Sequence, residues 1–246
     1  MSSTEFNIED SPEAVFQFML DQGWSDGLPV IPPTAERVRA MLDYAQRDAS
    51  ELVGYINPDA GSATVEKIAV NAVMAGCLPE YMPVMIAAVQ AITEPSFNIH
   101  GLQTTTNPVS PLMIINGPVR DRIGLNSGRG TLGPGYRANA TIGRAVRLLL
   151  LNVGGAKPWT TDMSLHGSPA KYISCMGENE EDSIWEPLHV ERGFSADQST
   201  VTVVGAQGMS NCLTFYKEPE SFLNMIASAM ADISDNNYLL AAGNPL

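Results

Sequence analysis

The stretch "PLMIINGPVRDRIGLNSGRGTLGPGYRANATIGRAVRLLLLNVGG", residues 111–155, decides the fold class. It begins with a nearly continuous apolar run, 111–117, which is typical of a strand covered on both faces. Five glycines and a proline fill residues 124–136 and predict a loop. Residues 137–155 then carry a helical apolar pattern that ends in two glycines. The stretch therefore predicts a strand of a central sheet, followed by a glycine loop that runs into a helix.

Other segments of the chain extend this pattern. Strands are predicted at "ELVGYI" (51–56), "KYISCMG" (171–177) and "TVTVVGA" (200–206), "FNIHGLQTTT" (97–106) is expected to be extended, and "NNYLLAAG" (236–243) to begin a further strand. Further helices are predicted from capping residues, prolines and apolar periodicity at 12–22, 34–45, 61–76, 79–93 and 218–233. Strands and helices do not alternate strictly. The fold class is therefore α/β or α+β, with a mixed central sheet flanked by helices, long ordered Gly/Pro-rich loops and an N-terminal arm.

The first 34 residues are predicted to be a helix followed by a proline-rich arm. Ser11 can cap the helix with Pro12 at its first position, and Gly23 ends it. The arm, "GWSDGLPVIPP" (23–33), would expose much apolar surface if it were free. We expect it to lie on the body or on a neighbouring subunit, and residues 35–246 to form a single globular α/β body.

Composition limits the partners of this chain. The formal net charge is −13, and no run of Lys or Arg offsets it, which argues against binding to nucleic acid or to an anionic membrane. The start has neither the basic nor the apolar region of a secretory signal, and no apolar run reaches the roughly 18 residues of a membrane span. A soluble, cytoplasmic protein is expected. Hydrophobic residues make up 44% and charged residues 17%, which favours a homo-oligomer.

The glycine loop is the first candidate site. Its amides and the following helix N-terminus can approach an anion, and six arginines lie between 120 and 147. Candidate residues for binding a small anionic substrate are Arg129, Arg137, Asn126, Asn139, Gly133 and Gly135. The letters "GRGTLG" match a dinucleotide fingerprint, but the setting does not. The alternative is a tight loop that only packs the helix against its neighbours.

The acidic stretch "ENEEDSIWEPLHVE" (178–191) is the second candidate. His189 with Glu186 or Glu178 could transfer protons, and His189, Glu191 and His100 could hold a divalent metal such as iron, manganese or zinc. The alternative is a solvated acidic loop with one structural histidine. Three members are expected to be surface residues in either case: Glu180, Glu181 and Asp182.

Two weaker candidates remain. The segment "HGLQTTTNP" (100–108) concentrates polar side chains and predicts either a polar pocket with His100 and Gln103 or a tie between loops. The three cysteines, Cys77, Cys175 and Cys212, show no disulfide or zinc spacing. Cys77, just before an expected helix N-terminus, and Cys175, late in a strand next to the acidic stretch, are both candidate nucleophiles or redox thiols, and Cys77 is preferred. A small buried apolar side chain is the alternative.

Stretches spread over most of the chain resemble a bacterial family associated with the UGSC (seleno)proteins and with thiol–disulfide chemistry. The resemblance is carried by "WSDGLPVIPPT", "NAVMAGCLPEYMPV", "NIHGLQTTTNPVSPLMIINGP", "NSGRGTLGPGYRANATIGRA" and "ENEEDSIWEPLHVERGF". It implies a partner module with a U/C-G-S-C redox motif. This chain has neither selenocysteine nor Cys-Gly-Ser-Cys, so the motif would come from another polypeptide. The resemblance transfers no catalytic residue.

These observations lead to three functional hypotheses. The first is a cytosolic enzyme or enzyme subunit that acts on a small anionic metabolite by redox or lyase/hydratase chemistry, together with a second, redox-active subunit. The second is a noncatalytic scaffold subunit of a hetero-oligomer. The third is a metal-dependent hydrolase. The sequence names no cofactor beyond the possible divalent metal.

Overall fold

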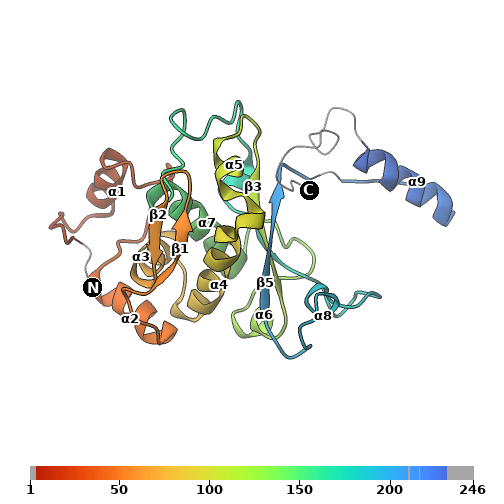
Figure 1. The fold of residues 1–246 in the computed structure, drawn as a ribbon, viewed down its shortest axis with the longest axis horizontal. Helices are drawn as coiled ribbons and strands as arrows, with labels where there is room; N and C mark the ends of the chain where they lie inside the picture. Colours follow the sequence, from red (N-terminus) through yellow and green to blue (C-terminus); the bar gives the residue numbers. More distant parts are fainter. Residues whose placement is uncertain (1–3, 210, 216, 232–246) are drawn as a thin grey trace.

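The computed structural model describes residues 4–209, 211–215 and 217–231 (Figure 1). The α-helices are α1 Pro12–Asp21, α2 Ala35–Ala45, α3 Val65–Ala75, α4 Met82–Thr93, α5 Ile99–Thr104, α6 Val119–Arg122, α7 Arg137–Asn152, α8 Leu188–Glu191 and α9 Pro219–Met230. Three 3-10 turns lie at Pro79–Tyr81, Pro95–Phe97 and Pro169–Lys171. The strands are β1 Leu52–Ile56, β2 Gly61–Thr64, β3 Ser110–Asn116, β4 Cys175–Gly177 and β5 Thr200–Ala206.

The strands form an antiparallel pair and a small mixed sheet. β1 pairs with β2, and the second sheet has the order β4-β3-β5. β3 is parallel to β4 and antiparallel to β5, with Ser110 opposite Ala206 and Asn116 opposite Thr200. The predicted central strand is thus the middle strand of the mixed sheet, and the fold belongs to the α+β class.

The core lies between the helices and the two sheets. α3 packs on α7 and α2, whereas α4 contacts both β1 and β5 (Figure 1). α7 is buried along most of its length because apolar residues recur at Ile142, Ala145, Val146 and Leu149. This helix therefore packs against the arm as well as against the segment 156–174.

Local sequence signals explain most helix boundaries. The side chains of Ser11, Thr34 and Thr64 accept backbone hydrogen bonds at the starts of α1, α2 and α3, as their residue types predicted. Gly76 ends α3 with a φ of 94°, a left-handed conformation that favours glycine. The prediction for the glycine loop is also confirmed, since residues 124–136 run directly into α7.

Two predictions of extended structure were wrong. Residues 99–104 form α5, because Asn98 adopts a left-handed conformation and its side chain accepts a hydrogen bond from the Gly101 amide at 3.2 Å. In "KYISCMG" only Cys175–Gly177 is a strand, since Pro169 and the Ser168 cap begin a 3-10 turn. The strand expected in 236–243 lies outside the described residues.

The arm lies on the body. The Arg144 guanidinium donates two hydrogen bonds of 2.8 Å to the Asp26 carboxylate and two more to the carbonyls of Leu28 and Pro29. The Ile31 amide donates to the Met74 carbonyl at 3.1 Å. The arm is therefore fixed to α3 and α7 by polar contacts as well as by its apolar side chains.

Within the part of the chain that the structure describes, no helix is both long enough and apolar enough to cross a membrane.

Candidate functional site

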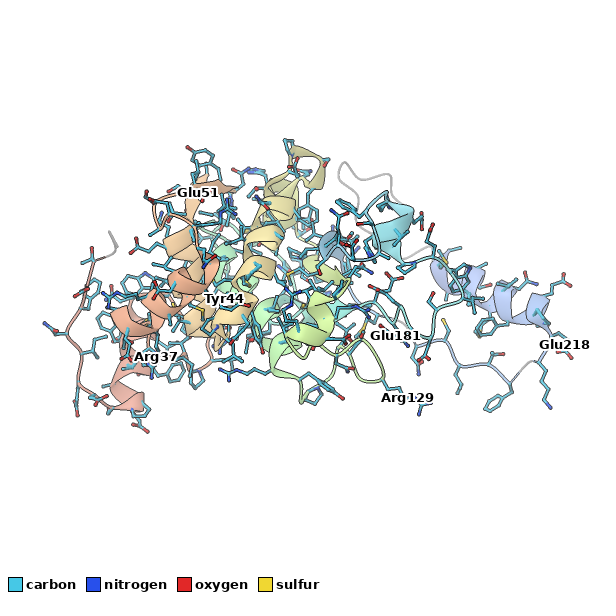
Figure 2. The ribbon with its side chains drawn as sticks, turned by 90° about the horizontal axis from the view of Figure 1, so that it is seen from below. Arg37, Tyr44, Glu51, Arg129, Glu181 and Glu218 are labelled. Carbon is cyan, nitrogen blue, oxygen red and sulfur yellow. The ribbon has the colours of Figure 1, made fainter. Side chains whose placement is uncertain are left out.

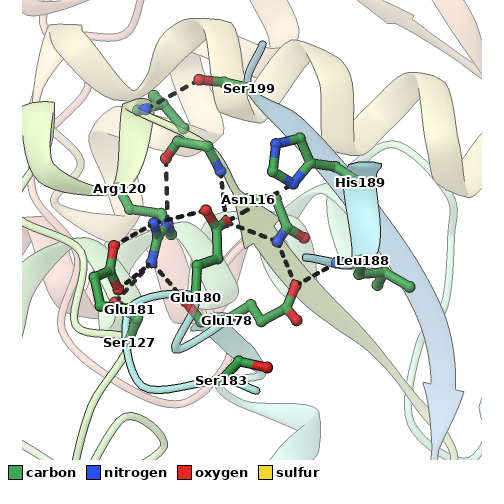
Figure 3. A network of polar contacts seen from close by, with 12 residues as sticks. Asn116, Arg120, Ser127, Glu178, Glu180, Glu181, Ser183, Leu188, His189 and Ser199 are labelled. Carbon is green, nitrogen blue, oxygen red and sulfur yellow. Dashed lines mark hydrogen bonds and ion pairs between the residues drawn. The ribbon is translucent and has the colours of Figure 1, made fainter. Parts of the chain in front are cut away.

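The acidic stretch is held by one buried arginine, Arg120 (Figure 3). Its Nη2 lies 2.9 Å from Glu180 Oε2 and 2.8 Å from Glu181 Oε1. Its Nη1 donates to the Glu178 carbonyl at 2.6 Å, and its Nε to the Gly117 carbonyl at 3.2 Å. Burial lowers the pKa of Arg120, but the hydrogen bond with Glu181 and the charge of Glu180 outweigh burial and raise it. Arg120 therefore stays charged and ties the stretch to the end of β3.

Asn116, the last residue of β3, is the second anchor of this network. Its fully buried amide donates to Glu178 Oε2 and, at 2.8 Å, to Glu180 Oε1 (Figure 3). Glu178 Oε2 also accepts from the Leu188 amide at 2.9 Å, at the start of α8. The carboxylates of Glu178 and Glu180 thus have structural partners.

The expectation that Glu180 is a surface residue was wrong, whereas Glu181 lies at the surface as expected. The Glu180 side chain is only 13% exposed and Glu181, although 62% exposed, pairs with Arg120. Asp182 is exposed as expected. The partners come from 58 or more residues earlier in the chain, so the local composition of the stretch did not reveal them.

His189 is the candidate acid/base residue, and it lies 1% exposed on α8. Its Nδ1 is 3.9 Å from Glu180 Oε1, and neither ring nitrogen has a hydrogen-bond partner among the described residues. The carboxylates predicted to act with it are placed differently: Glu186 and Glu191 are exposed, and Glu178 binds Asn116 and Leu188. A role of His189 in proton transfer stays a prediction.

The predicted metal set is not assembled. His100 is exposed on α5, which lies at the opposite end of β3 and β5 from α8, the helix of His189 and Glu191 (Figure 1). Among the described residues no group of three or more His, Cys, Asp or Glu side chains could hold a metal ion. The prediction of a metal site from His189, Glu191 and His100 was wrong because the fold separates the two histidines.

The glycine loop is closed by hydrogen bonds of two asparagines, Asn126 in the loop and Asn139 in α7. Asn139, 2% exposed, accepts from the Asn126 amide at 2.9 Å and donates to the carbonyls of Asn126 and Thr131 at 2.9 and 3.1 Å. Asn126 in turn accepts from the Gly128 amide and donates to the Arg129 carbonyl. The side chains of both asparagines are thus occupied by the loop itself. For these two residues the structure agrees with the alternative prediction, a tight loop that only packs the helix against its neighbours.

The arginines near this loop do not converge on one anion. Arg137 donates to the Gly76 carbonyl at 3.0 Å, and the Arg129 side chain extends outward from the loop (Figure 2). Gly133 and Gly135 are exposed. Arg120 and Arg144 are paired with carboxylates, and Arg147 lines a cleft on another side of the molecule, described below.

The surroundings of Cys77 argue against the prediction that this thiol is reactive. Burial raises the pKa of the Cys77 thiol to about 12, although a hydrogen bond with Thr141 and the charge of Arg137 lower it. Burial also raises the pKa of Cys175, which lies near Cys77. Cys77 therefore remains a thiol at neutral pH and fills space in the core.

We expect only one cysteine of the native protein to react rapidly with an aromatic disulfide reagent near pH 8. Cys212 is exposed, whereas Cys77 and Cys175 are buried and protonated. Absorbance of the released thiolate should give one fast equivalent per chain and three after unfolding in denaturant. The Cys212→Ser variant should lack the fast equivalent. A second fast thiol in the native protein would contradict this assignment.

A cleft of about 760 Å³ lies where the arm, α7 and the segment after α7 meet. Arg147 and Leu151 of α7 form one wall, and Ser25 and Asp26 of the arm form another. The remaining lining comes from the segment 158–172, namely Pro158, Trp159, Asp162, Ser164, Leu165, His166, Gly167, Ser168, Pro169, Lys171 and Tyr172. This volume is in the range of small-molecule sites.

Charged groups in the cleft wall meet at one carboxylate, Asp162, which is 7% exposed. Lys171 Nζ lies 2.6 and 2.7 Å from its two oxygens, and Arg147 Nη2 lies 3.4 Å from Oδ2. Burial lowers the pKa of Lys171 and that of Arg147, while Asp162 raises both. One buried carboxylate therefore serves two cations.

Asp26 also lines the cleft, but it does not neutralise the second cation paired with Asp162. Arg144 already binds both of its oxygens. Among the described residues of this region, the ion pairs of Arg144, Arg147 and Lys171 involve two carboxylates, Asp26 and Asp162, which leaves one positive charge when all are ionised. Gln103, predicted as a pocket residue, accepts from Arg147 Nη1 at 3.4 Å behind the cleft. The predicted Gln103 thus lies beside the arginine that lines the cleft.

Two further features of the cleft are typical of binding sites. Trp159 is 75% exposed and has a φ of 63°, a conformation that costs energy in a residue other than glycine. The buried Ser164 hydroxyl has no hydrogen-bond partner among the described residues. Strain and an unused polar group are commonly kept at sites where a ligand binds.

The cleft was not predicted from the sequence, because residues 156–169 have no periodic apolar pattern. A signal was present in "AKPWTTDMSLHGSPAKY" (156–172), where Trp, Asp and His lie between two prolines and a lysine lies outside each proline. Their meeting depends on the arm and on α7, which lie far away in the sequence.

Comparisons of the chain with family models, with curated proteins and with solved structures gave no match.

Proposed function

We propose that this protein is an enzyme, or an enzyme subunit, that binds a small anionic metabolite in the cleft between the arm and α7. The observation that carries this proposal is the pairing of Arg147 and Lys171 with the single carboxylate of Asp162 in the wall of a 760 Å³ cleft. In a chain with a net charge of −13, a local excess of positive charge is a specific feature. An anion is the ligand that such an excess favours.

Different lining residues can contact different parts of the ligand. Arg147 offers planar donors suited to a carboxylate or phosphate, and Asp162 holds it in position. Exposed Trp159 and Tyr172 can cover the apolar part of a small ligand. A bound anion would also offset the burial that lowers the pKa of Arg147. The ligand and the cation would thus stabilise each other.

The test is a titration by isothermal calorimetry with phosphate, pyruvate and succinate, with pyruvamide as the uncharged control. The Arg147→Met variant should bind the preferred anion about 10- to 100-fold more weakly, because a hydrogen bond to a charged group is lost. Asp162 keeps Lys171 as a partner, so the variant is expected to fold. Circular dichroism checks the fold.

The matched control is Arg129→Met, which removes the exposed arginine of the glycine loop. The affinity of this variant should equal that of the original protein. If Arg129→Met weakens binding and Arg147→Met does not, the anion binds at the glycine loop and the proposal for the cleft is wrong. Binding of no anion by the folded protein would also overturn the proposal.

A further inference from the structure

Lys171 differs from an ordinary surface lysine in its surroundings. It is the last residue of the 3-10 turn Pro169–Lys171, its side chain is 11% exposed, and its Nζ lies in the cleft wall against both oxygens of Asp162. The turn and the paired carboxylate fix the position of the amine. A fixed, desolvated amine beside a proton acceptor is the arrangement that nucleophilic lysines need.

The second cation of the cleft favours the neutral form of this amine. Arg147 shares Asp162 with Lys171, so the carboxylate stabilises two positive charges at once. Burial lowers the pKa of Lys171 most, the hydrogen bond and charge of Asp162 raise it, and the charge of Arg147 lowers it again. The amine is therefore deprotonated more easily than a free lysine.

We propose that Lys171 forms an imine with the carbonyl carbon of a small oxo acid whose carboxylate is bound by Arg147. This inference rests on the proposed binding of an anion in the cleft and names its class: an aldehyde or ketone that carries a carboxylate. Both side chains line the same cleft and contact the same residue, Asp162. A molecule that pairs with Arg147 thus brings its neighbouring carbonyl group within reach of Nζ.

The step balances within the cleft. The Lys171 ammonium gives one proton to Asp162, and the neutral amine attacks the carbonyl carbon. A C–N bond forms and the carbonyl π electrons move to oxygen, which takes a proton to give the carbinolamine. This oxygen leaves as water after receiving a second proton, and the nitrogen lone pair forms the C=N bond. Two ammonium protons depart with the carbonyl oxygen, and the product is the protonated imine.

The Ser164 hydroxyl gives this intermediate a polar partner. It lines the cleft, and no described residue hydrogen-bonds to it. Its backbone amide donates to Asp162 Oδ1 at 3.2 Å, which keeps the serine next to the carboxylate. In this assignment Ser164 donates to the carbinolamine oxygen.

The experiment is borohydride trapping. The full chain is incubated with pyruvate or glyoxylate, reduced with sodium cyanoborohydride, and measured by intact and peptide mass spectrometry. The expected result with pyruvate is a single adduct on Lys171, with the mass of pyruvate less one oxygen atom. Succinate, which has no ketone or aldehyde group, should give no adduct and should compete with the oxo acid.

Two variants separate this reaction from unspecific reduction at surface amines. Lys171→Arg keeps the positive charge next to Asp162 but cannot form an imine, so the adduct should be lost completely. Lys157→Arg, at an exposed lysine of the same segment, should leave the adduct unchanged. Adducts only on exposed lysines, or an adduct that persists in Lys171→Arg, would overturn the inference.

Failure of the inference and failure of the proposed function give different results. If calorimetry shows that Arg147 binds anions and no adduct forms on Lys171, the imine is excluded and the proposed binding site stands. If the protein binds no anion and forms no adduct, both are overturned.

Discussion

Replacement of Arg120 with methionine is expected to lower the free energy of unfolding by about 3 kcal/mol. Arg120 is 4% exposed, and its ion pairs neutralise Glu180, whose side chain is 13% exposed. Without the arginine this carboxylate remains largely buried with no cation beside it. The value lies at the lower end for a broken buried pair, because Asn116 and the Gly117 amide still donate to Glu180 at 2.8 Å.

Urea unfolding monitored by circular dichroism measures this loss as a shift of the midpoint at unchanged slope. Arg122→Met is the matched control, because Arg122 lies on the same short helix but is exposed. Its free energy of unfolding should stay within about 0.5 kcal/mol of the original value. Equal losses in both variants would show that Arg120 does not stabilise the acidic stretch through its ion pairs.

The second large effect is expected for Gly117→Ala. Gly117 has a φ of 79°, and a Cβ atom there would lie 2.1 Å from the Gln198 carbonyl oxygen. The left-handed conformation costs alanine about 1–2 kcal/mol, and displacing the neighbouring backbone adds about 1–3 kcal/mol. Thermal and urea unfolding should therefore show a loss of about 2–5 kcal/mol.

Gly124→Ala is the control that measures the conformational cost without the steric contact. Gly124 has a φ of 64°, but a Cβ atom at this position would have no neighbouring atom within 4 Å. This variant should lose only the conformational cost of about 1–2 kcal/mol, so the difference between the two variants measures the clash with Gln198. If Gly124→Ala were as destabilising as Gly117→Ala, the contact between a Cβ atom at position 117 and the Gln198 carbonyl would not contribute to the loss of stability.

Both predictions concern the same junction, where β3 ends and the acidic stretch is attached. The Gly117 amide donates to Glu180, and the Gly117 carbonyl accepts from Arg120. The stretch that most resembled a reaction site is therefore built mainly of structural contacts. The cleft around Asp162 has the opposite character, because its cations exceed the carboxylates that pair with them.

Much of the fold could be predicted because its signals are local. Ser11, Thr34 and Thr64 cap helices as their residue types indicate, and the apolar run 111–117 predicted the central strand β3. The prediction of extended structure at 97–106, where α5 lies, was wrong for a reason that is also local. Asn98 in the left-handed conformation starts a short helix in a segment rich in threonine, which composition alone assigned to extended structure.

Less of the candidate site could be predicted. Arg147 was recognised only as one member of an arginine cluster, and Gln103 as a pocket residue. Lys171, Asp162 and Trp159 were not singled out, because their positions depend on a loop with no periodic pattern. The metal ligands were predicted from residue type and the reactive cysteine from its place before an expected helix, and neither signal specifies the distances between side chains or their burial.

The sequence by itself determined the longer helices, the central strand, the glycine loop and the acidic balance of the chain, since these depend on neighbours a few residues away. Only the tertiary structure decided which of the arginines with a carboxylate partner has to share that carboxylate with a second cation. Arg144 meets Asp26 across 118 residues and Arg120 meets Glu181 across 61, so both are neutralised, whereas Arg147 must share Asp162 with Lys171. Coulomb attraction falls with distance in space and not with separation in sequence, and the fold therefore sets where an anion can bind.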